Sequence, residues 1–377
     1  MLKTNSQGSK RLRVCHIISG DLWAGAEVMA YHLLHGLKAY PDIELSAVVL
    51  NEGKPSEEIM RLGIPCYVIN ESKLSFFEIY WEAKKLLKNW SLDIIHSHRY
   101  KENLLAYFLS KTQKGITLVG TQHGMPEAYG ASRSLKNRFV SKLNLLVLSR
   151  CFQDIVAVSR DIQMAFMNQY GFPKDKVKVI HNGINIPEDL HGRREKDTFV
   201  IGSSGRLFPV KDYPLMVEVA RQVSKIRSSI RFELAGDGPE RLNIQDLIKK
   251  YGLNGTFMLR GFLSDISPFY QGLDVYLNTS FHEGIPISVL EAMAYGIPVI
   301  APKVGGLVEI MEDGVQGFLI EGRNPKDFAE KCLQLYQNKT LRTQMSFAVR
   351  EKVIKEFSID RMAEQYYSLY RDVAGIG

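Results

Sequence analysis

Two successive runs of alternating strand and helix patterns constrain the fold of this chain more than any other feature of its sequence. In both runs, short apolar segments typical of buried strands alternate with helical patterns. The strands predicted in the first run span residues 13–19, 44–50, 66–69, 93–96, 117–121, 155–158 and 178–180. Those predicted in the second run span residues 199–203, 230–235, 257–259, 274–277, 298–301 and 317–320. The alternation predicts an α/β protein with two parallel, doubly wound, Rossmann-like sheets.

A hydrophilic stretch at residues 187–198 separates the two runs. It contains a charged run at 193–197 and is predicted to link two domains, 1–187 and 188–356. A chain of 377 residues is also too long for one ordinary hydrophobic core. Two α/β domains joined in this way form a cleft, which is a common location for a ligand.

The composition is that of a soluble globular protein, with 45% hydrophobic and 24% charged residues. No apolar run approaches the ~18 residues of a membrane span, and the first residues lack the core of a signal peptide. The four cysteines, at positions 15, 66, 151 and 332, form no Cys-x-x-Cys pair, which is typical of reduced packing residues. We therefore expect a cytoplasmic protein.

The net charge of +7 is concentrated in the first half of the chain. Residues 1–187 carry 24 Lys and Arg against 16 Asp and Glu, whereas residues 188–377 carry 24 against 25. An anionic membrane, a phosphorylated acceptor, nucleic acid or a merely solvated surface would each fit such an excess. No recognisable nucleic-acid-binding motif accompanies it, so nucleic acid is not expected as a partner.

The segment 134–150 mixes basic and apolar residues in a helical pattern. Its basic residues are Lys136, Arg138, Lys142 and Arg150, and its apolar ones include Leu135, Phe139, Leu143 and Leu146. A basic amphipathic helix can lie on anionic lipid. An ordinary helix with its apolar face in the core fits the same pattern, so the sequence leaves both roles open.

Two carboxylates, Glu283 and Glu291, flank the predicted start of a helix in the second run. A polar loop at 278–285 precedes it, Pro286 is predicted as its first residue, and Gly296 as its left-handed cap. The unpaired amides at such a helix start favour anions such as a diphosphate, in the crevice where open α/β sheets bind ligands. Spacing alone would more often indicate two solvated surface carboxylates.

Cations and small residues follow other predicted strands. Arg206 and Lys211 could stabilise the negative charge of a departing diphosphate, although as a bare pair they would be ordinary surface cations. Gly25 lies between the first strand and the first helix, where small residues let backbone amides approach a phosphate. The sequence has no Asp-x-Asp triplet and no zinc-type Cys/His cluster, so no metal or other cofactor is expected.

Histidines follow two predicted strands of the first run. His123 comes directly after the strand at 117–121, and His98 follows the strand at 93–96. With Arg99 and Tyr100, His98 is a candidate to line the cleft. No metal-ligand spacing involves His96 and His98, and a packing role fits them equally well.

The segment 280–301 resembles the donor-binding motif of family 4 retaining glycosyltransferases, in which a Glu, seven residues and a second Glu hold the sugar and ribose of a nucleotide sugar. The segment 204–212 resembles the family's Arg and Lys pair, and 234–240 its Gly-rich turn at a strand end. The segment 181–184 is similar to its Asn-Gly-Ile at the domain boundary. The match runs in order over essentially the whole chain. At the glycine loop, Ala24 stands where the family usually has the first of two glycines.

The resemblance implies the GT-B fold, in which two Rossmann-like domains face a central cleft. It also implies that the last segment, residues 357–377, forms a helix that packs back on the N-terminal domain. The implied catalytic residues are His123, Arg206, Lys211 and Glu283. The implied donor-binding residues are Gly25, Gly205, Gly236, Phe262, Gly284, Ile285, Pro286, Ile287 and Glu291. The expected acceptor-side residues are His98, Arg99 and Tyr100.

Within this scheme the resemblance assigns each group a role. Glu291 would bond the ribose and Glu283 the sugar hydroxyls, while His123 would contact the sugar from across the cleft. Arg206 and Lys211 would stabilise the leaving diphosphate. The leaving phosphate would help to take the acceptor's proton, so neither carboxylate need be a nucleophile.

The implied activity is metal-independent, retaining transfer of a sugar from a nucleotide diphosphate sugar, expected to be a UDP-sugar. The expected acceptor is a glycan or a polyprenyl-linked glycan, as in bacterial surface polysaccharide synthesis. The basic N-terminal half favours peripheral contact with the anionic inner face of the cytoplasmic membrane. Two alternatives stay open: a sugar-nucleotide epimerase of the same architecture, and a non-catalytic nucleotide-binding protein.

Overall fold

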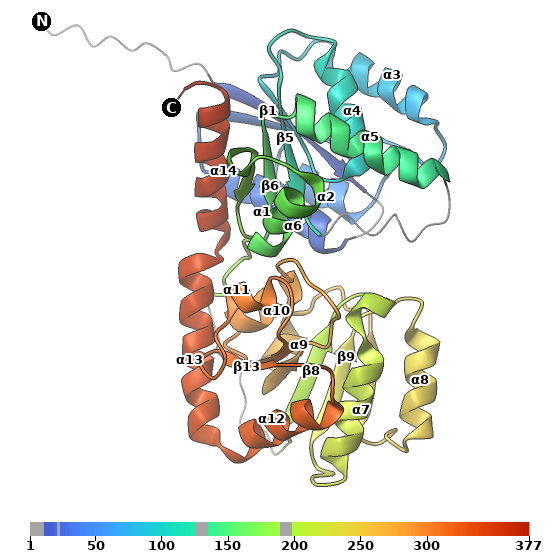
Figure 1. Ribbon diagram of the computed structural model, residues 1–377, viewed down its shortest axis with the longest axis vertical. Coiled ribbons are helices and arrows are strands. Elements are labelled where there is room, and N and C mark those ends of the chain that lie inside the picture. Colours follow the sequence, from blue (N-terminus) through green and yellow to red (C-terminus); the bar gives the residue numbers. More distant parts are fainter. Residues whose placement is uncertain (1–10, 21–22, 125–134, 189–197, 377) are drawn as a thin grey trace, which may run out of the picture. The chain divides into compact units, whose positions relative to one another are not determined.

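The computed structural model describes residues 11–20, 23–124, 135–188 and 198–376, with the side chains of 135–137 excepted. The chain forms two compact units (Figure 1). The first joins Met1–Gly183 to Ile359–Gly377, and the second is Ile184–Ser358. The charged run at 193–197, predicted to lie in a linker, falls outside the described residues.

The first unit is built on a seven-stranded parallel sheet with the order β3-β2-β1-β4-β5-β6-β7. Its strands are β1 (Leu12–Ser19), β2 (Ile43–Leu50), β3 (Cys66–Ile69), β4 (Ile94–Ser97), β5 (Thr117–Gln122), β6 (Asp154–Ala157) and β7 (Val177–Val179). The connecting helices are α1 (Gly25–Leu37), α2 (Lys54–Arg61), α3 (Phe76–Leu87), α4 (Tyr100–Ser110), α5 (Leu135–Cys151) and α6 (Arg160–Tyr170). A 3-10 turn, η1 (Lys174–Lys176), precedes β7.

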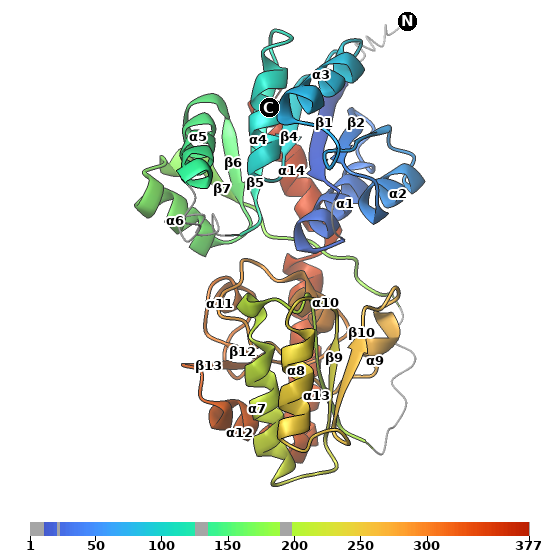
Figure 2. The same ribbon diagram turned by 90° about the vertical axis from the view of Figure 1, so that its right-hand side faces the viewer.

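Helices cover both faces of this sheet (Figures 1 and 2). Alternate residues of a strand point to opposite faces, so Cys15 and Ile17 of β1 pack in the core beneath α3, α4 and α5. His16, between them, points to the other face, which is covered by α14 (Ile359–Val373). Within the first unit α14 packs on α1, where a Cβ on Gly36 would lie 2.7 Å from side-chain atoms of both Ile359 and Ala363. The predicted return of the last helix to the N-terminal unit is therefore confirmed.

The second unit is built on a six-stranded parallel sheet with the order β10-β9-β8-β11-β12-β13. Its strands are β8 (Val200–Ser204), β9 (Arg231–Ala235), β10 (Phe257–Gly261), β11 (Val275–Leu277), β12 (Val299–Pro302) and β13 (Gly317–Ile320). Its helices are η2 (Pro209–Lys211), α7 (Tyr213–Ser224), α8 (Arg241–Lys250), α9 (Ser267–Gln271), α10 (Ile287–Ala294), α11 (Leu307–Ile310), α12 (Pro325–Gln337) and α13 (Lys339–Glu356). Buried residues of α7, α8 and α12 form one core with the sheet.

Each of the predicted strands is present, with its ends displaced by at most two residues. The prediction that Pro286 is the first helical residue is wrong: Pro286 is extended, with ψ 115°, and caps α10, which begins at Ile287. Gly296 does follow the helix in the left-handed conformation, with φ 66°. Within the described residues, no helix combines the length and the apolar composition that crossing a bilayer requires.

Candidate active site

Glu283 lies in the loop between β11 and α10 and is almost completely buried. Its Oε1 accepts hydrogen bonds from Lys211 Nζ at 2.6 Å, from Ser280 Oγ at 2.6 Å and from Asn278 Nδ2 at 3.4 Å. Burial alone would raise the pKa of Glu283, but the charge of Lys211 and these hydrogen bonds hold the pKa below its usual value. Glu283 is therefore an ionised carboxylate at neutral pH, fixed in position by three donors.

Two glycines that the sequence analysis did not single out hold the loop of Glu283. They follow β12, where a Cβ on Gly305 would lie 2.1 Å from the Glu283 carbonyl oxygen and one on Gly306 would lie 1.8 Å from the Gly284 oxygen. Gly306 N also donates to the Glu283 carbonyl at 2.9 Å. No side chain larger than hydrogen fits this contact. The Gly-Gly pair shortly after the strand predicted at 298–301 was the available signal.

Glu291 lies in the second turn of α10 in a different environment. Its Oε2 accepts a hydrogen bond from the Tyr270 hydroxyl at 2.7 Å, and that hydroxyl lies 2.9 Å from Ser204 Oγ at the end of β8. Burial raises the pKa of Glu291 to about 7, and the bond from Tyr270 offsets only part of this effect. One carboxylate of the motif is thus held ionised, whereas the other is close to half-protonated at neutral pH.

The two predicted cations differ in their contacts. Arg206 is exposed after β8, with its guanidinium 4.9 Å from the centre of the Phe208 ring. Lys211 instead forms the ion pair with Glu283. Arg323, missed by the sequence analysis, pairs with Asp212 beside Lys211 and donates to the Ser280 carbonyl at 3.1 Å. It therefore ties the Lys211 turn to the Glu283 loop, a contact across 111 residues that sequence spacing does not reveal.

Three other predicted donor-binding residues of the second unit are Ile285, Ile287 and Phe262. The side chains of Ile285 and Ile287 are buried, so a ligand at this helix start would meet their backbone. The start of α10 has no side-chain cap, which leaves its first amides suited to an anion. Phe262 follows β10 and is 65% exposed, so its ring is accessible for stacking.

Gly205 and Gly236 touch at the ends of β8 and β9. Gly236 has φ 137°, and a Cβ there would lie 1.9 Å from the Gly205 carbonyl oxygen. We expect the steric clash in Gly236→Ala to destabilise the second unit by about 1–3 kcal/mol and to lower its melting temperature by several degrees. Gly252→Ala is the matched control, because Gly252 also has positive φ, 69°, but has no atom within 4 Å. Equal losses from both variants, measured by thermal unfolding, would contradict the clash.

In the first unit, His123 follows β5 and lies at one end of a continuous series of hydrogen bonds. We call this series the histidine chain; its members are Tyr366, Thr121, His96, Tyr370, His16, His98 and His123. The links from the α14 end are Tyr366 hydroxyl to Thr121 Oγ1 at 2.8 Å, Thr121 Oγ1 to His96 Nε2 at 2.7 Å, and His96 Nδ1 to the Tyr370 hydroxyl at 2.6 Å. They continue from Tyr370 to His16 Nε2 at 3.3 Å, from His16 Nδ1 to His98 Nε2 at 3.1 Å, and from His98 Nδ1 to His123 Nε2 at 3.2 Å.

The histidines of this chain are neutral. Burial lowers the pKa of His16 and of His123 to about 3, with Arg99 adding to the effect at His123. Burial also lowers the pKa of His96 and His98 well below its usual value, and the neighbouring histidines add to this. His98 is 2% exposed and sits inside the chain, which favours the packing role that the sequence left open.

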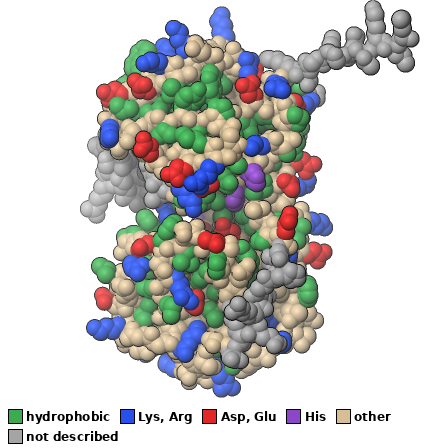
Figure 3. Space-filling view, turned by 180° about the vertical axis from the view of Figure 1, so that it is seen from behind, with side chains coloured by type: hydrophobic (Ala, Val, Ile, Leu, Met, Phe, Trp, Pro, Cys, Tyr) green, Lys and Arg blue, Asp and Glu red, His purple; other side chains and the backbone are tan. Residues whose placement is uncertain are grey.

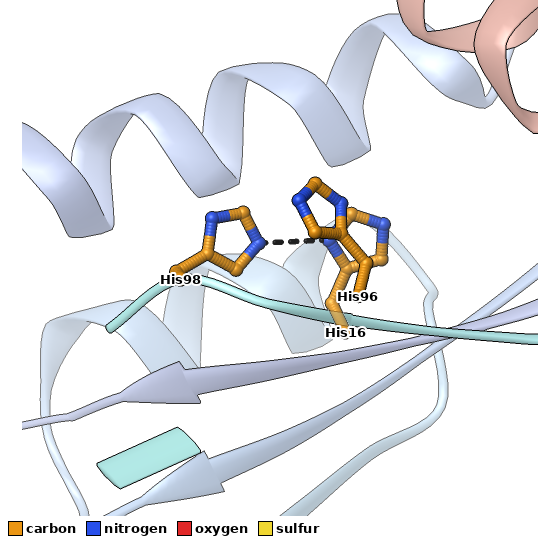
Figure 4. A group of neighbouring side chains, drawn as sticks. All are labelled: His16, His96 and His98. Carbon is orange, nitrogen blue, oxygen red and sulfur yellow. Dashed lines mark hydrogen bonds between the residues drawn. The ribbon is translucent and has the colours of Figure 1, made fainter. Parts of the chain in front are cut away.

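Three of these rings, His16, His96 and His98, also come close enough to be considered as metal ligands, with one nitrogen of each within 4.8 Å of the others (Figure 4). In the described structure, however, both ring nitrogens of each histidine already have a hydrogen-bond partner. The arrangement is therefore satisfied by its own hydrogen bonds.

The remaining predicted residues of the first unit lie near the starts of α1 and α4. Arg99 caps α4, and its Nη2 lies 2.6 Å from Oε1 of the buried Glu27 on α1. Tyr100 is partly buried in the first turn of α4. Gly25 begins α1 without a side-chain cap, and a Cβ there would meet no described atom within 4 Å. The phosphate contact predicted at this helix start stays a prediction.

Comparison with known proteins places the sequence in a family. The model for Glycosyltransferase Family 4 matches residues 23–188, and that for Glycosyl transferases group 1 matches residues 188–352. The UDP-Gal:alpha-D-GlcNAc-diphosphoundecaprenol alpha-1,3-galactosyltransferase of Escherichia coli is 27% identical over 336 residues, which cover 84% of this chain and 85% of that protein. The N-acetyl-alpha-D-glucosaminyl L-malate synthase of Bacillus anthracis is 27% identical over 296 residues, 75% of each chain.

Solved structures agree at the level of the fold. HepE of Anabaena in complex with UDP-glucose superposes with a TM-score of 0.83 at 20% identity, over 96% of this chain and 100% of that chain. The two family models together run from residue 23 to residue 352 and meet at residue 188. The chain therefore belongs to the family 4 glycosyltransferases with the GT-B fold.

Proposed function

We propose that this glycosyltransferase is retaining, takes its sugar from a UDP-sugar and needs no metal ion. The observation that carries the proposal is the contrast between Glu283, an ionised carboxylate paired with Lys211, and Glu291, which is close to half-protonated at neutral pH. A fixed anion suits the sugar and the positive charge that develops on it during transfer. A carboxyl group that is half-protonated at neutral pH can take up its charged form when the hydroxyls of a ribose donate hydrogen bonds to it.

The diphosphate would be bound by amides and cations of the second unit. The uncapped start of α10 and the exposed Arg206 supply positive charge without a metal. Lys211 is already paired with Glu283, so its part would be to orient that carboxylate as well as to meet the phosphate. Three donors bind Oε1 of Glu283 and reduce its nucleophilicity, which supports a front-face mechanism over one with a covalent intermediate.

The names of similar proteins favour a UDP-sugar donor and a lipid-linked acceptor. The Escherichia coli relative is named for UDP-Gal and a diphosphoundecaprenol-linked sugar, and HepE is described in complex with UDP-glucose. We therefore propose a glycan or polyprenyl-linked glycan as the acceptor.

A panel of nucleotide sugars tests this function directly. Each would be incubated with the protein without acceptor, and slow release of the nucleoside diphosphate would be measured. We expect release from one or a few UDP-sugars only. Conversion of the sugar to its epimer without release would instead identify an epimerase, and tight UDP binding with neither reaction would identify a non-catalytic binding protein.

We also propose that α5 contacts an anionic membrane peripherally. Its inner face is buried at Val147 and Leu148, whereas Phe139 is 68% and Leu146 44% exposed beside the exposed Arg138. Apolar and basic side chains together on one accessible helix suit the lipid interface. On the face of the protein in Figure 3, by contrast, basic and acidic side chains are interspersed among the described residues.

Reversal of charge on α5 tests the membrane contact. Arg138→Glu with Lys142→Glu is expected to abolish sedimentation with anionic vesicles at low salt, because each basic residue near the surface contributes about 1 kcal/mol. Lys174→Glu with Lys178→Glu makes the same charge change at exposed positions elsewhere in the first unit and serves as the control. Wild-type protein that ignores such vesicles, or equal loss from both double variants, would contradict this contact.

A further inference from the structure

The histidine chain crosses the interior of the first unit and joins the C-terminal helix α14 to His123. Its members come from β1, β4, β5 and α14 and from the residues directly after β4 and β5, and all of those before His123 are buried. Figure 4 shows the central link, in which the His98 and His16 rings face each other across a hydrogen bond. The sheet order explains why these residues meet. The strands β1, β4 and β5 are neighbours, and alternate side chains of each strand lie on the face of the sheet that α14 covers.

Each inner member of this chain has one proton to donate, and its hydrogen-bond partners among the described residues are its two neighbours in the chain. The hydroxyls of Thr121 and Tyr370 have a second lone pair, but a buried O–H needs an acceptor, so each donates to one neighbour and accepts from the other. A neutral imidazole does the same, because it carries its proton on only one ring nitrogen. The histidines are neutral because burial lowers their pKa values far below 7. All the hydrogen bonds must therefore point the same way along the chain, and the direction at one end fixes the direction at the other.

The α14 end determines that direction. The Tyr366 side chain is fully buried, and among the described residues its hydroxyl has Thr121 Oγ1 as its hydrogen-bond partner. A buried O–H without an acceptor costs more than an unused lone pair on oxygen, so Tyr366 donates and Thr121 accepts. Thr121 must then donate to His96 Nε2, which places the proton of His96 on Nδ1.

The same step repeats to the other end. His96 Nδ1–H donates to Tyr370, Tyr370 donates to His16 Nε2, and His16 Nδ1–H donates to His98 Nε2. His98 Nδ1–H then donates to His123 Nε2. His123 therefore accepts at Nε2 and carries its own proton on Nδ1. That Nδ1 is buried and has no protein partner among the described residues.

We propose that the histidine chain fixes the tautomer of His123, so that its Nδ1–H is held ready to donate a hydrogen bond to an oxygen of the bound donor sugar. The positioning residues are then Tyr366, Thr121, His96, Tyr370, His16 and His98. Helix α14 acts on His123 through the hydroxyls of Tyr366 and Tyr370. The contact with the sugar rests on the proposed function, but the tautomer is a property of the free protein. His123 in this form is a neutral donor and cannot serve as a base through Nδ1.

Nitrogen-15 NMR of the free wild-type protein with labelled histidine tests the tautomer without any substrate. His123→Gln identifies the His123 signals by their disappearance. We expect His123 to show a protonated Nδ1 and a bare Nε2 at pH 7, the reverse of the form that predominates for free histidine in water. A protonated Nε2, or a doubly protonated ring, would overturn the proposal.

Breaking the histidine chain far from His123 tests whether the direction of its hydrogen bonds determines the tautomer of His123. Tyr370→Phe removes the link between His96 and His16, and we expect His123 to lose its single Nδ1–H form and populate the Nε2–H form as well. Tyr367→Phe is the matched control, because it removes a hydroxyl of the same helix that bonds Asp42 outside the chain. We expect the control to retain the wild-type signals.

Three results would overturn transmission: Tyr370→Phe with wild-type His123 signals, the same change in both variants, or wild-type signals in Thr121→Val. The last variant cuts the chain at a second point with a side chain of the same shape, so the test survives if Tyr370→Phe fails to fold. An altered tautomer in a protein that cleaves no nucleotide sugar would refute the proposed function alone. Normal sugar transfer with an unordered His123 would refute the histidine chain alone.

Discussion

Replacing Glu283 with glutamine is expected to lower kcat for sugar transfer by roughly 100- to 1000-fold, the usual scale for losing a preorganised electrostatic contact in the transition state. Glutamine keeps the size of the side chain and can still accept from Ser280 and Asn278. It removes the negative charge of Glu283, which we propose contacts the donor sugar, and it leaves Lys211 without its ion-pair partner. Since we assign the nucleotide to other groups of the motif, the Kd for UDP should change only a few-fold.

Glu233→Gln is a suitable control for this variant. Glu233 pairs with Arg260 through two hydrogen bonds on the second unit, away from the Glu283 loop in the sequence and in its contacts. It should leave kcat unchanged, and melting temperatures would confirm that both variants fold. If Glu283→Gln turned over donor at the wild-type rate, or lost UDP affinity as strongly as turnover, the role assigned to Glu283 would be wrong.

Replacing Glu291 with alanine is expected to have the opposite effect. Loss of the hydrogen bonds to the ribose should weaken UDP binding by about 1–3 kcal/mol, with a smaller change in kcat at saturating donor. Titration calorimetry with UDP and steady-state kinetics would separate the two quantities. Equal effects on UDP affinity from the Glu283 and Glu291 variants would refute the division of roles between them.

The pKa of Glu291, raised to about 7, adds a pH dependence to this prediction. Ribose hydroxyls donate to a carboxylate and favour its charged form, so UDP binding should release a proton and strengthen as the pH rises from about 6 to 8. In the free protein, the contribution of Glu291 to folding stability depends on pH with the opposite sign. The stability due to protonated Glu291 is present below its ordinary pKa and is lost as the pH rises through about 7. Both effects should vanish in Glu291→Gln.

The fold could be predicted from the sequence because each element depends on local pattern. Buried parallel strands such as Gly317–Ile320 are continuous apolar runs, and the spacing between them leaves room for only one crossover helix. The one local error, at Pro286, arose because proline suits both the first helical residue and the extended residue before it. The two carboxylates of the motif were also identified from sequence, since they flank a helix start that the pattern predicts.

The environment of these groups could not be predicted in the same way. The ion pair of Lys211 with Glu283 joins residues 72 apart, and nothing in either segment indicates the other. The approach of Gly305 to the Glu283 carbonyl depends on backbone geometry at the end of β12. The histidine chain depends on the order of β1, β4 and β5 in the sheet and on the docking of α14, so its members are separated by up to 354 residues.

Transfer to a simple alcohol tests the central claim most directly. The UDP-sugar selected by the panel would be incubated with excess glycerol in the presence of EDTA, and UDP and the glycerol glycoside would be quantified, with proton NMR of the anomeric centre. A glycoside, unlike a free sugar, does not interconvert its anomers in water. We expect equal amounts of UDP and of a glycoside with the anomeric configuration of the donor. An inverted glycoside, or activity that EDTA abolishes and magnesium or manganese restores, would contradict a retaining, metal-independent transferase.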